Sequence, residues 1–282
     1  MTYNEFKMQS LCSFDGFIEN AKNEIDTILM HFSGMKRNEL LLNRANIIPD
    51  EILDKLNDAV NRRLSGEPIQ YIIGEWEFFG LRMFCGKGCL IPRPETEMLA
   101  EVAIKTLPRG GKLLDLCTGS GCISVAVLNN RPDVTAVAVD ISAQALEYAK
   151  KNAHYHGINL DRLKFINADI YEYEPDFLPD LIVSNPPYIK SSDLATLSKE
   201  VQHEPMLALD GGHDGLDFYK LIAKFFCKKY LNEHGCCAVE VGYDIGEEVA
   251  AIFRSLKYET TLLRDDFEVD RVCLAKKSEK FL

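Results

Sequence analysis

The sequence predicts an α/β protein in which a small helical domain precedes a doubly wound domain with a mostly parallel sheet. Between Asp15 and about Val60, the apolar residues recur at helical spacing. In the C-terminal two thirds, apolar strand-like segments alternate with helical segments of about 10–15 residues, which is typical of βαβ units with right-handed crossovers. The 282 residues are enough for one large domain and one small domain.

Residues 1–73 are therefore assigned to the helical domain and residues 74–90 to a connector. Within the first region, Pro49 and Asp50 are typical of a helix start. The stretch PIQYIIGEWEFFGLRMFCGKG combines strand-forming residues, from Tyr71–Ile73 onward, with interspersed glycines. This composition predicts a β-hairpin that joins the two domains.

Residues 91–282 are assigned to the α/β domain, in which a helix is expected to begin near Pro94. The final stretch, LKYETTLLRDDFEVDRVCLAKK, holds two strand candidates with no helix between them. That arrangement predicts an antiparallel pair at the edge of the sheet. A seven-stranded sheet results when this pair is added to the strands KLLDL, TAVAVD, LKFINAD, DLIVSN and GCCAVEV.

The composition argues against several classes of function. A net charge of −11 opposes attraction to phosphate backbones, so direct binding to nucleic acid is not expected. No apolar run approaches the ~20 residues that span a membrane, and the N-terminus has neither a signal nor a transit pattern. We therefore expect a cytoplasmic protein without a membrane partner. The nine cysteines lack the spacing of a zinc site and are expected to be reduced and mostly buried.

No metal is expected at the remaining polar clusters. His203, Glu204 and His213 do not repeat any spacing of metal ligands. The segment Asp210–Gly215, DGGHDG, lacks the alternating ligands and the terminal glutamate of a calcium loop. It is interpreted as a flexible rim over a substrate cleft.

A cofactor loop is predicted where DLCTGSGCIS follows the first strand of the α/β domain. Asp115 ends that strand, and Gly119 and Gly121 permit a tight turn into a helix, although many such turns use glycine for backbone geometry alone. Asp140 ends the second strand roughly 20 residues later, where a carboxylate can accept both hydroxyl hydrogens of a ribose. Together these features favour a cofactor that contains adenosine.

The loop favours S-adenosyl-L-methionine over a dinucleotide. Ser124 stands where a dinucleotide fingerprint has its third glycine, and the loop has no basic residue to hold a pyrophosphate. Asp115 suits a cofactor with a cationic amino-acid end. After the third strand, Asp169 can accept a hydrogen bond from the adenine amino group, and Ile170 can lie on the ring. Alternatively, Asp169 only caps a turn.

The fourth strand, DLIVSN, continues into Asn-Pro-Pro-Tyr at the sheet edge where ligands bind in such folds. The Asn185 side-chain oxygen and the Pro186 carbonyl can each accept one N–H of a planar NH2 group, which leaves a face of the nitrogen toward a methyl donor. The fixed φ angles of Pro186 and Pro187 preset this geometry, and Tyr188 can stack on the flat target. The motif could instead be a turn that only ends the strand.

These motifs together resemble class I S-adenosylmethionine-dependent methyltransferases that modify planar amino groups. PIQYIIGEWEFFGL, LIPRPETE and EPMLALDGGHDGLDFY further resemble the protein-(glutamine-N5) methyltransferases of peptide chain release factors. The resemblance implies a Rossmann-like methyltransferase sheet, methylation of the glutamine in the Gly-Gly-Gln loop of class 1 release factors, and S-adenosyl-L-homocysteine as product. It also implies that the helical domain recognises the protein substrate, and we expect a monomer.

By the same resemblance, the glutamine is held by Asn185, Pro186, Pro187 and Tyr188, with Asn185 and Pro186 as the catalytic pair. The residues that the resemblance implies to contact the cofactor are Cys117, Thr118, Gly119, Ser120, Gly121, Asp140, Ile170 and Asn185. Asp115 and Asp169 are added to this set because of their positions at strand ends. Cys117 departs from the family, in which glycine is commoner, and it should be tolerated if its φ is negative. Cys122 is either a second reactive thiol or is buried in the first turn of the helix.

Other readings remain open at this point. The same Asn-Pro-Pro-Tyr chemistry would serve an adenine-N6 methyltransferase of nucleic acid, which would need a basic groove. A non-catalytic S-adenosylmethionine-binding or ribosome-associated module is the alternative from another class. The residues Arg93, Glu95, Thr96 and Glu97 either line the mouth of the pocket or simply form a charged, N-capped helix start.

Overall fold

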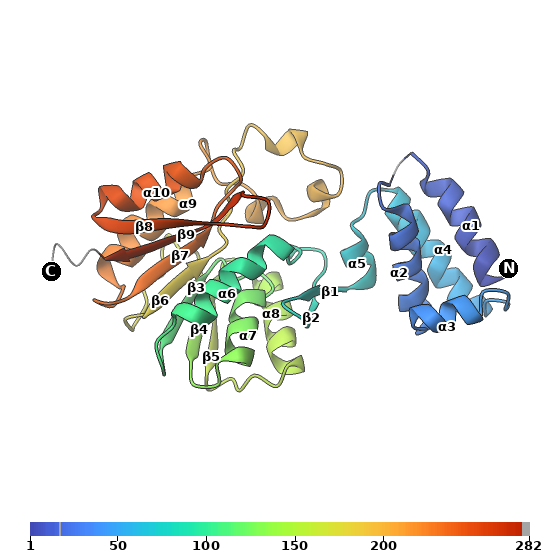
Figure 1. Ribbon diagram of the computed structural model, residues 1–282, viewed down its shortest axis with the longest axis horizontal. Coiled ribbons are helices and arrows are strands. Elements are labelled where there is room, and N and C mark those ends of the chain that lie inside the picture. Colours follow the sequence, from blue (N-terminus) through green and yellow to red (C-terminus); the bar gives the residue numbers. More distant parts are fainter. Residues whose placement is uncertain (17, 278–282) are drawn as a thin grey trace. The chain divides into compact units, whose positions relative to one another are not determined.

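A computed structural model describes residues 1–16 and 18–277, which form two compact units (Figure 1). The first unit contains Met1–Gly74 together with Ser198–His203, and the second contains the other described residues. Each unit is described by itself below.

The first unit is a helical bundle, as its apolar spacing predicts. The first helix begins at a capping box, in which the Thr2 side chain accepts from the Glu5 backbone N–H and the Glu5 carboxylate accepts from the Thr2 N–H. The core of the bundle includes the fully buried Phe14, Ile25 and Leu56. Its helices are α1 (Tyr3–Phe14), α2 (Ala21–Ser33), α3 (Arg37–Leu42), α4 (Asp50–Leu64) and α5 (Ile69–Ile73).

The last of these helices corrects the sequence interpretation. Tyr71, Ile72 and Ile73 lie in α5 and not in a strand. Pro68 precedes the helix with a φ of −58°, so the chain enters the turn with a preset dihedral angle, and the helix buries Ile69, Tyr71 and Ile72. Burial of these side chains overrides their preference for strands. By contrast, α4 begins at Asp50 after Pro49, as predicted.

The second unit begins with an antiparallel hairpin of β1 (Glu75–Phe78) and β2 (Leu81–Phe84). A single 3₁₀ turn at Pro94–Thr96 then leads into α6 (Glu97–Thr106), which agrees with the helix start predicted near Pro94. The other helices are α7 (Cys122–Asn130), α8 (Ala143–Tyr155), α9 (Asp217–Leu221), which continues as a π-helical segment at Ile222–Cys227, and α10 (Gly246–Ser255). Further 3₁₀ turns lie at Leu194–Thr196 and Met206–Ala208, and the turn Val201–His203 belongs to the first unit.

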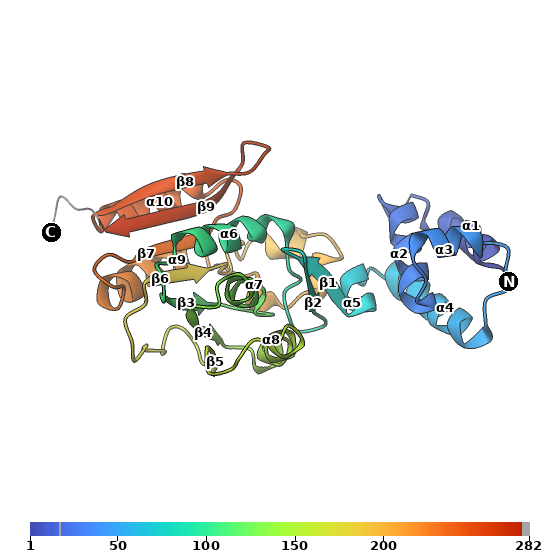
Figure 2. The same cartoon turned by 60° about the horizontal axis from the view of Figure 1, so that its bottom comes forward.

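The sheet of this unit has seven strands in the order β5-β4-β3-β6-β7-β9-β8. The first five strands of this order pair in parallel, while β9 pairs antiparallel with both β7 and β8, so the predicted fold class is confirmed. Figure 2 shows β8 and β9 side by side at one edge. The strands are β3 (Lys112–Leu116), β4 (Thr135–Asp140), β5 (Leu163–Asn167), β6 (Leu181–Ser184), β7 (Cys236–Glu240), β8 (Tyr258–Arg264) and β9 (Asp270–Lys277).

Alternate residues of the central strands bury opposite faces of this sheet. Leu113 packs in one core with residues of α6 and α7, whereas Leu114 packs in a second core with residues of the α9 region and α10. The strand order reverses between β3 and β6, because the chain first proceeds outward to β5 and then returns to the other side of β3. Such a switch point leaves a crevice at the carboxyl ends of the strands.

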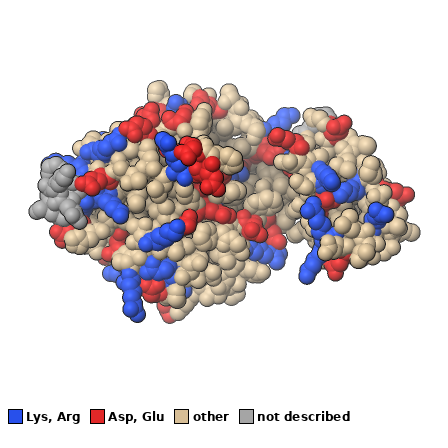
Figure 3. Space-filling model, viewed as in Figure 1, with Lys and Arg blue, Asp and Glu red and all other residues tan. Residues whose placement is uncertain are grey.

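The surface and the cysteines fit the expectations from composition. Figure 3 shows basic and acidic side chains interspersed on the visible face of the second unit. All nine cysteines are free, and all except Cys12 and Cys117 are buried. In residues 1–16 and 18–277, none of the helices has the length and apolar character needed to cross a bilayer.

Candidate active site

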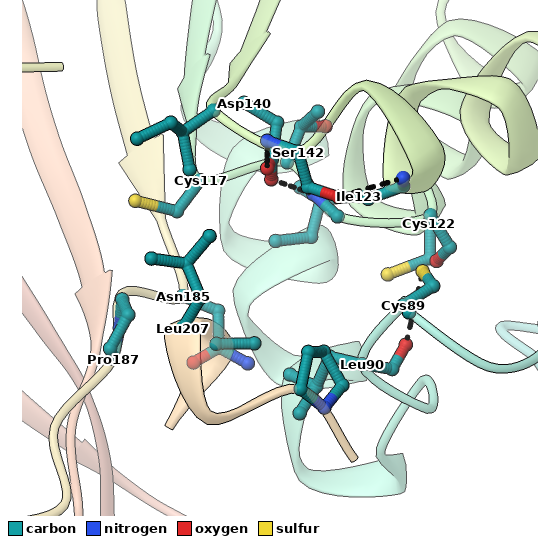
Figure 4. A pocket seen from close by; sticks show the side chains of 18 of the residues that line it. Cys89, Leu90, Cys117, Cys122, Ile123, Asp140, Ser142, Asn185, Pro187 and Leu207 are labelled. Carbon is teal, nitrogen blue, oxygen red and sulfur yellow. Dashed lines mark hydrogen bonds between the residues drawn. The ribbon is translucent and has the colours of Figure 1, made fainter. Parts of the chain in front are cut away.

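A cavity of about 270 Å³ lies at the switch point of the sheet (Figure 4). Its walls come from the segments that follow β3, β4, β5 and β6, and from Gly88–Arg93 and Thr96 before α6. Pro205, Leu207, Ala208 and Phe218 reach the cavity from a distant part of the chain, and α7 and α8 also contribute lining residues. The sequence therefore places the ends of four parallel strands around one cavity.

The glycine loop forms the wall after β3. Cys117, Thr118, Gly119 and Ser120 line the cavity, and Gly121 lies just outside the lining as the N-cap of α7. The φ of Gly121 is 74°, and a Cβ there would lie 2.9 Å from the Ala149 Cβ. Only glycine satisfies both constraints, so this loop packs closely on α8.

Cys117 does not meet the condition that the sequence analysis set for it. Its φ is 60°, in the left-handed region, whereas tolerance of the side chain was expected for a negative φ. Cys117 therefore occupies a glycine-like backbone position with its thiol beside the cavity. Burial raises the pKa of this thiol, and the carboxylate of Asp140 raises that pKa further. The thiol is thus protonated at neutral pH and a poor nucleophile.

The neighbouring Cys122 is buried in the first turn of α7, as one of its two readings predicted. Burial raises the pKa of its thiol to about 12. The geometry therefore favours a structural role over a reactive thiol at this position.

Asp115 lies beneath the loop and is not part of the cavity lining. Its Oδ2 atom accepts hydrogen bonds from the hydroxyls of Thr118 and Ser124, both at 2.6 Å. Its Oδ1 atom has no hydrogen-bond partner among the described residues. Burial raises the Asp115 pKa to about 6 although both hydroxyls lower it. Asp115 therefore holds the loop in place through its hydrogen bonds to Thr118 and Ser124. Ser124 is the residue that stands in place of the third glycine of a dinucleotide fingerprint.

Asp140 ends β4 and reaches across to the glycine loop. Its Oδ2 accepts from the Gly119 N–H at 2.8 Å, and its Oδ1 accepts from the Ser142 N–H at 2.8 Å. Each oxygen of the Asp140 carboxylate has a further lone pair, so the two oxygens can still accept the hydrogens of two ribose hydroxyls. The side chain lines the cavity, and burial raises its pKa.

The segment after β5 supplies Asp169 and Ile170 to the cavity wall. The Asp169 Oδ1 accepts from the Tyr171 N–H at 2.9 Å, so the residue does cap a turn, and it also lines the cavity. The sequence analysis missed Tyr171 and Phe218, whose rings pack edge to face at 5.8 Å between centroids. Because Phe218 lies in a distant helix, no local motif indicated it.

The Asn-Pro-Pro-Tyr segment follows β6, and only two of its four residues line the cavity. Asn185 and Pro187 line the cavity, whereas Pro186 and Tyr188 do not. Tyr188 packs against Gly242, and burial raises the pKa of its phenol. The stacking role of Tyr188 stays a prediction, because in this structure its ring contributes to the core.

The DGGHDG segment braces this motif and was not expected to do so. The Ile189 N–H donates to the Leu209 carbonyl at 2.9 Å, and the Gly211 N–H donates to the Ile189 carbonyl at 2.8 Å. A Cβ on Gly211 would lie 2.6 Å from the Tyr188 Cα, so the two backbones touch. The glycine allows this close approach, and the segment is a packed support where the sequence analysis expected a flexible rim.

The residues around the start of α6 differ in whether they line the cavity. Arg93 and Thr96 line the cavity, and Glu95 and Glu97 do not. Glu97 instead accepts from the Phe79 N–H of the hairpin at 2.8 Å. The Asn185 Nδ2 donates to the Thr96 hydroxyl at 3.1 Å, which links this segment to the end of β6.

Glu204 joins two parts of the wall that are far apart in sequence. Its buried carboxylate accepts from the Ile91 N–H at 3.0 Å and pairs with the Arg93 guanidinium. Burial raises the Glu204 pKa, and Arg93 opposes that shift. Glu204 was considered as a metal ligand in the sequence analysis, but it is engaged in this ion pair. Across the described part of the chain, no group of three residues is arranged to hold a metal ion.

The chain was compared with known proteins, and two family models match it. The PrmC N-terminal domain matches residues 12–74, and the Methyltransferase small domain matches residues 94–207. A release factor glutamine methyltransferase of Geobacter sulfurreducens is 38% identical over 257 residues, which are 90% of this chain and 89% of that protein. The protein of the same name from Clostridium acetobutylicum is 39% identical over 243 residues, 84% of each chain.

Among solved structures, the hMettl16 catalytic domain in complex with the MAT2A 3'UTR hairpin 1 has a TM-score of 0.57 at 15% identity, over 90% of this chain and 89% of that one. At such an identity the likeness establishes the fold alone. The fold, the cavity at its switch point and the small-domain model define a methyltransferase. Within that class, the chain belongs to the release factor glutamine methyltransferase family.

Proposed function

We propose that this protein transfers the methyl group of S-adenosyl-L-methionine to the side-chain amide nitrogen of the glutamine in the Gly-Gly-Gln motif of class 1 peptide chain release factors. The observation that carries the proposal is the position of Asn185, whose amide lines the cavity at the end of β6 with its NH2 group bound to Thr96. This hydrogen bond leaves the Asn185 oxygen as an acceptor for a substrate amide. The related proteins are named release factor glutamine methyltransferases, and these names support a release factor as the substrate.

The residues of the cavity fit an adenosine cofactor. Asp140 retains lone pairs for the two ribose hydroxyls, while Asp169 and Ile170 form an adenine subsite with one acceptor and one apolar surface. The backbone from Cys117 to Ser120 faces the amino-acid end, and Asp115 and Gly121 hold this loop in place. When bound, S-adenosylmethionine would supply an electrophilic methyl group on its sulfonium sulfur, and the neutral thioether S-adenosyl-L-homocysteine would be the leaving group and product.

The chain itself orients the nucleophile. An amide nitrogen is a poor nucleophile because its lone pair is delocalised into the carbonyl. The Asn185 Oδ1, which lines the cavity, accepts one N–H of the glutamine, and the Pro186 carbonyl, which lies outside the lining, is proposed to accept the other. Two acceptors fix the plane of the amide and favour positive charge on its nitrogen. The methylated nitrogen is acidic enough to lose its extra proton afterwards, so no side chain has to act as a general base.

Charge and domain organisation favour a protein substrate over nucleic acid. The net charge of −11 disfavours a phosphate backbone. We assign residues 1–73 to recognition of the release factor, residues 74–90 to the hairpin connector and residues 91–282 to methyl transfer. We further propose that the protein acts as a monomer in the cytoplasm and without a metal.

Incubation of the purified protein with labelled S-adenosylmethionine and a class 1 release factor tests the proposal. We expect label on a single glutamine, located by mass mapping of the modified peptide. A release factor with that glutamine replaced by alanine is the matched control and should stay unlabelled. Label found only on added RNA or DNA would instead indicate an adenine methyltransferase. Cofactor binding without transfer to any substrate would indicate a binding module.

A further inference from the structure

Three side chains from distant parts of the second unit meet at the cavity wall, which Thr96 and Asn185 line. Thr96 lies at the start of α6, Asn185 follows β6, and Glu240 ends β7. The Asn185 Nδ2 donates to the Thr96 Oγ1 at 3.1 Å, and the Glu240 carboxyl lies near enough to the Thr96 hydroxyl for that hydroxyl to lower the Glu240 pKa. Thr96 is 1% exposed and Glu240 is 3% exposed, so water does not compete for these bonds.

The direction of these hydrogen bonds follows from the number of hydrogens available. An ionised carboxylate only accepts, so a hydrogen bond between Thr96 and an ionised Glu240 requires Thr96 to donate its single hydroxyl hydrogen. The hydroxyl can then only accept from Asn185, which must present its NH2 group to it. Since the oxygen and nitrogen of an amide lie on opposite sides of Cγ, the Asn185 oxygen points away from Thr96 and is available to a ligand. The opposite rotamer would place an NH2 group against the NH2 group of the substrate.

We infer that Thr96 and Glu240 are positioning residues for methyl transfer: the ionised Glu240 fixes Thr96 as an acceptor, and Thr96 thereby turns the Asn185 oxygen toward the substrate amide. This inference rests on the proposed function. Neither side chain has to touch the reacting atoms. The catalytic contact is made by Asn185, and the other two residues act through it.

The surroundings of Glu240 make this arrangement sensitive to protonation. Burial raises the Glu240 pKa to about 7, and Glu95 raises it further, while Thr96, Arg271 and Arg93 lower it. Both arginines have closer partners, since Arg271 bonds to Asp265 at 2.7 Å and Arg93 pairs with Glu204. The other titratable groups that face Glu240 are Tyr188, Tyr219 and Cys122, of which the Tyr219 hydroxyl donates to the Glu240 backbone carbonyl at 2.8 Å.

Protonation of Glu240 would remove the constraint on the direction of the hydrogen bonds that the Thr96 hydroxyl makes. It can donate to Thr96, whose hydroxyl hydrogen is then free to point at Asn185 and to favour the opposite amide rotamer. Turnover should therefore decline as the pH falls through about 7, the pKa to which burial raises Glu240.

Four variants test this inference in the full-length protein. Thr96→Val removes the hydroxyl at nearly constant shape and should lower kcat by about tenfold to a hundredfold, with the dissociation constant for S-adenosylmethionine within about twofold of wild type. Thr96→Ser restores the hydroxyl and should recover most of the turnover. Glu240→Gln should lower kcat and abolish its decline near pH 7. Thr260→Val, on the half-buried edge strand β8, controls for the loss of a threonine hydroxyl elsewhere.

An NMR measurement separates this inference from the proposed function. The side-chain amide resonances of Asn185, assigned by comparison with Asn185→Ala, should titrate with a midpoint near pH 7 in the wild type and not in Glu240→Gln. This readout does not require turnover, so it decides the arrangement even if no release factor is methylated. If Glu240→Gln fails to fold, the pH titration of the wild type and the turnover of Thr96→Val and Thr96→Ser still test the inference. A folded Thr96→Val with wild-type kcat, or an Asn185 resonance insensitive to pH, would overturn the inference.

Discussion

The carboxylate of Asp140 accepts a hydrogen bond from the backbone N–H of Gly119 at 2.8 Å, so the end of β4 holds the loop that follows β3. One side chain thus fixes the shape of the glycine loop and also presents lone pairs to the cavity. Both roles of Asp140 predict that the Asp140→Asn variant binds the cofactor more weakly.

Asp140→Asn should weaken binding of S-adenosylmethionine at least tenfold. An asparagine has one acceptor oxygen, so the N–H of either Gly119 or Ser142 loses its partner, and one ribose acceptor is lost as well. Hydrogen bonds to a charged group contribute roughly 1.5–3 kcal/mol each. Calorimetric titration with the cofactor measures the effect, with Asp133→Asn, two residues before the start of β4, as the control. Wild-type affinity in Asp140→Asn would contradict the assigned role.

Asn185→Ala should separate binding from catalysis. The substitution removes one acceptor for the glutamine amide and leaves the glycine loop and Asp140 in place. We expect kcat to fall on the order of a hundredfold, because orientation of the nucleophile is lost. The affinity for S-adenosylmethionine should change by no more than about threefold. Single-turnover kinetics and a cofactor titration provide both numbers, and an unchanged rate would show that Asn185 does not orient the substrate.

Cys117→Gly should stabilise the protein by roughly 0.5–1 kcal/mol. Cys117 has a φ of 60°, a conformation that costs an L-residue roughly 1–2 kcal/mol, and glycine avoids that cost at the expense of greater entropy in the unfolded chain. Cys117→Ala is the matched control, because it removes the thiol and keeps the Cβ atom and its strain. Urea denaturation of both variants measures the difference. Equal stabilities for glycine and alanine would argue against backbone strain at this position.

The free energy of unfolding should be highest near pH 4 and should decrease from there to about pH 7. Burial raises the pKa of Asp115 from 3.8 to about 6, and it raises that of Glu240 from 4.5 to about 7. A carboxyl with a raised folded-state pKa stabilises the fold fully below its unfolded pKa, and that stability is lost as the pH rises through the folded value. At the acid end, Arg131 lowers the pKa of Asp133, which opposes folding at low pH.

Denaturation at pH 4, 5, 6, 7 and 8 checks this profile, with an expected decrease of roughly 1.4 kcal/mol for each pKa unit of displacement and a plateau above pH 7. Glu240→Gln should remove the part of the decrease that lies between pH 4.5 and about 7 and keep the part between pH 3.8 and about 6 that belongs to Asp115. A stability that rises steadily from pH 5 to 8 would show that these two carboxyls are not buried as described.

Much of the site was predictable because its chemistry is local in sequence. The loop from Cys117 to Ser120, Asp140, the Asp169–Ile170 turn and Asn185 each follow a strand directly, and parallel strands bring their carboxyl ends to one edge. Once the alternation of strands and helices is recognised, the meeting of these residues follows from topology. The same reasoning could not place Leu207 or Phe218, because they reach the cavity from segments with no periodic relation to it.

The sequence by itself determined the fold class, the antiparallel edge pair and the identity of the strand-end residues, because apolar periodicity and turn chemistry are encoded within short windows. Only the tertiary structure decided whether Tyr71–Ile73 is a helix, whether Asp115 lies in the cavity wall, and which way the Asn185 amide points. Each of these depends on burial and on hydrogen bonds between segments far apart in sequence. For Asn185, the hydrogen-bond partner is Thr96, and this link exists only because the start of α6 and the end of β6 come together in the folded chain.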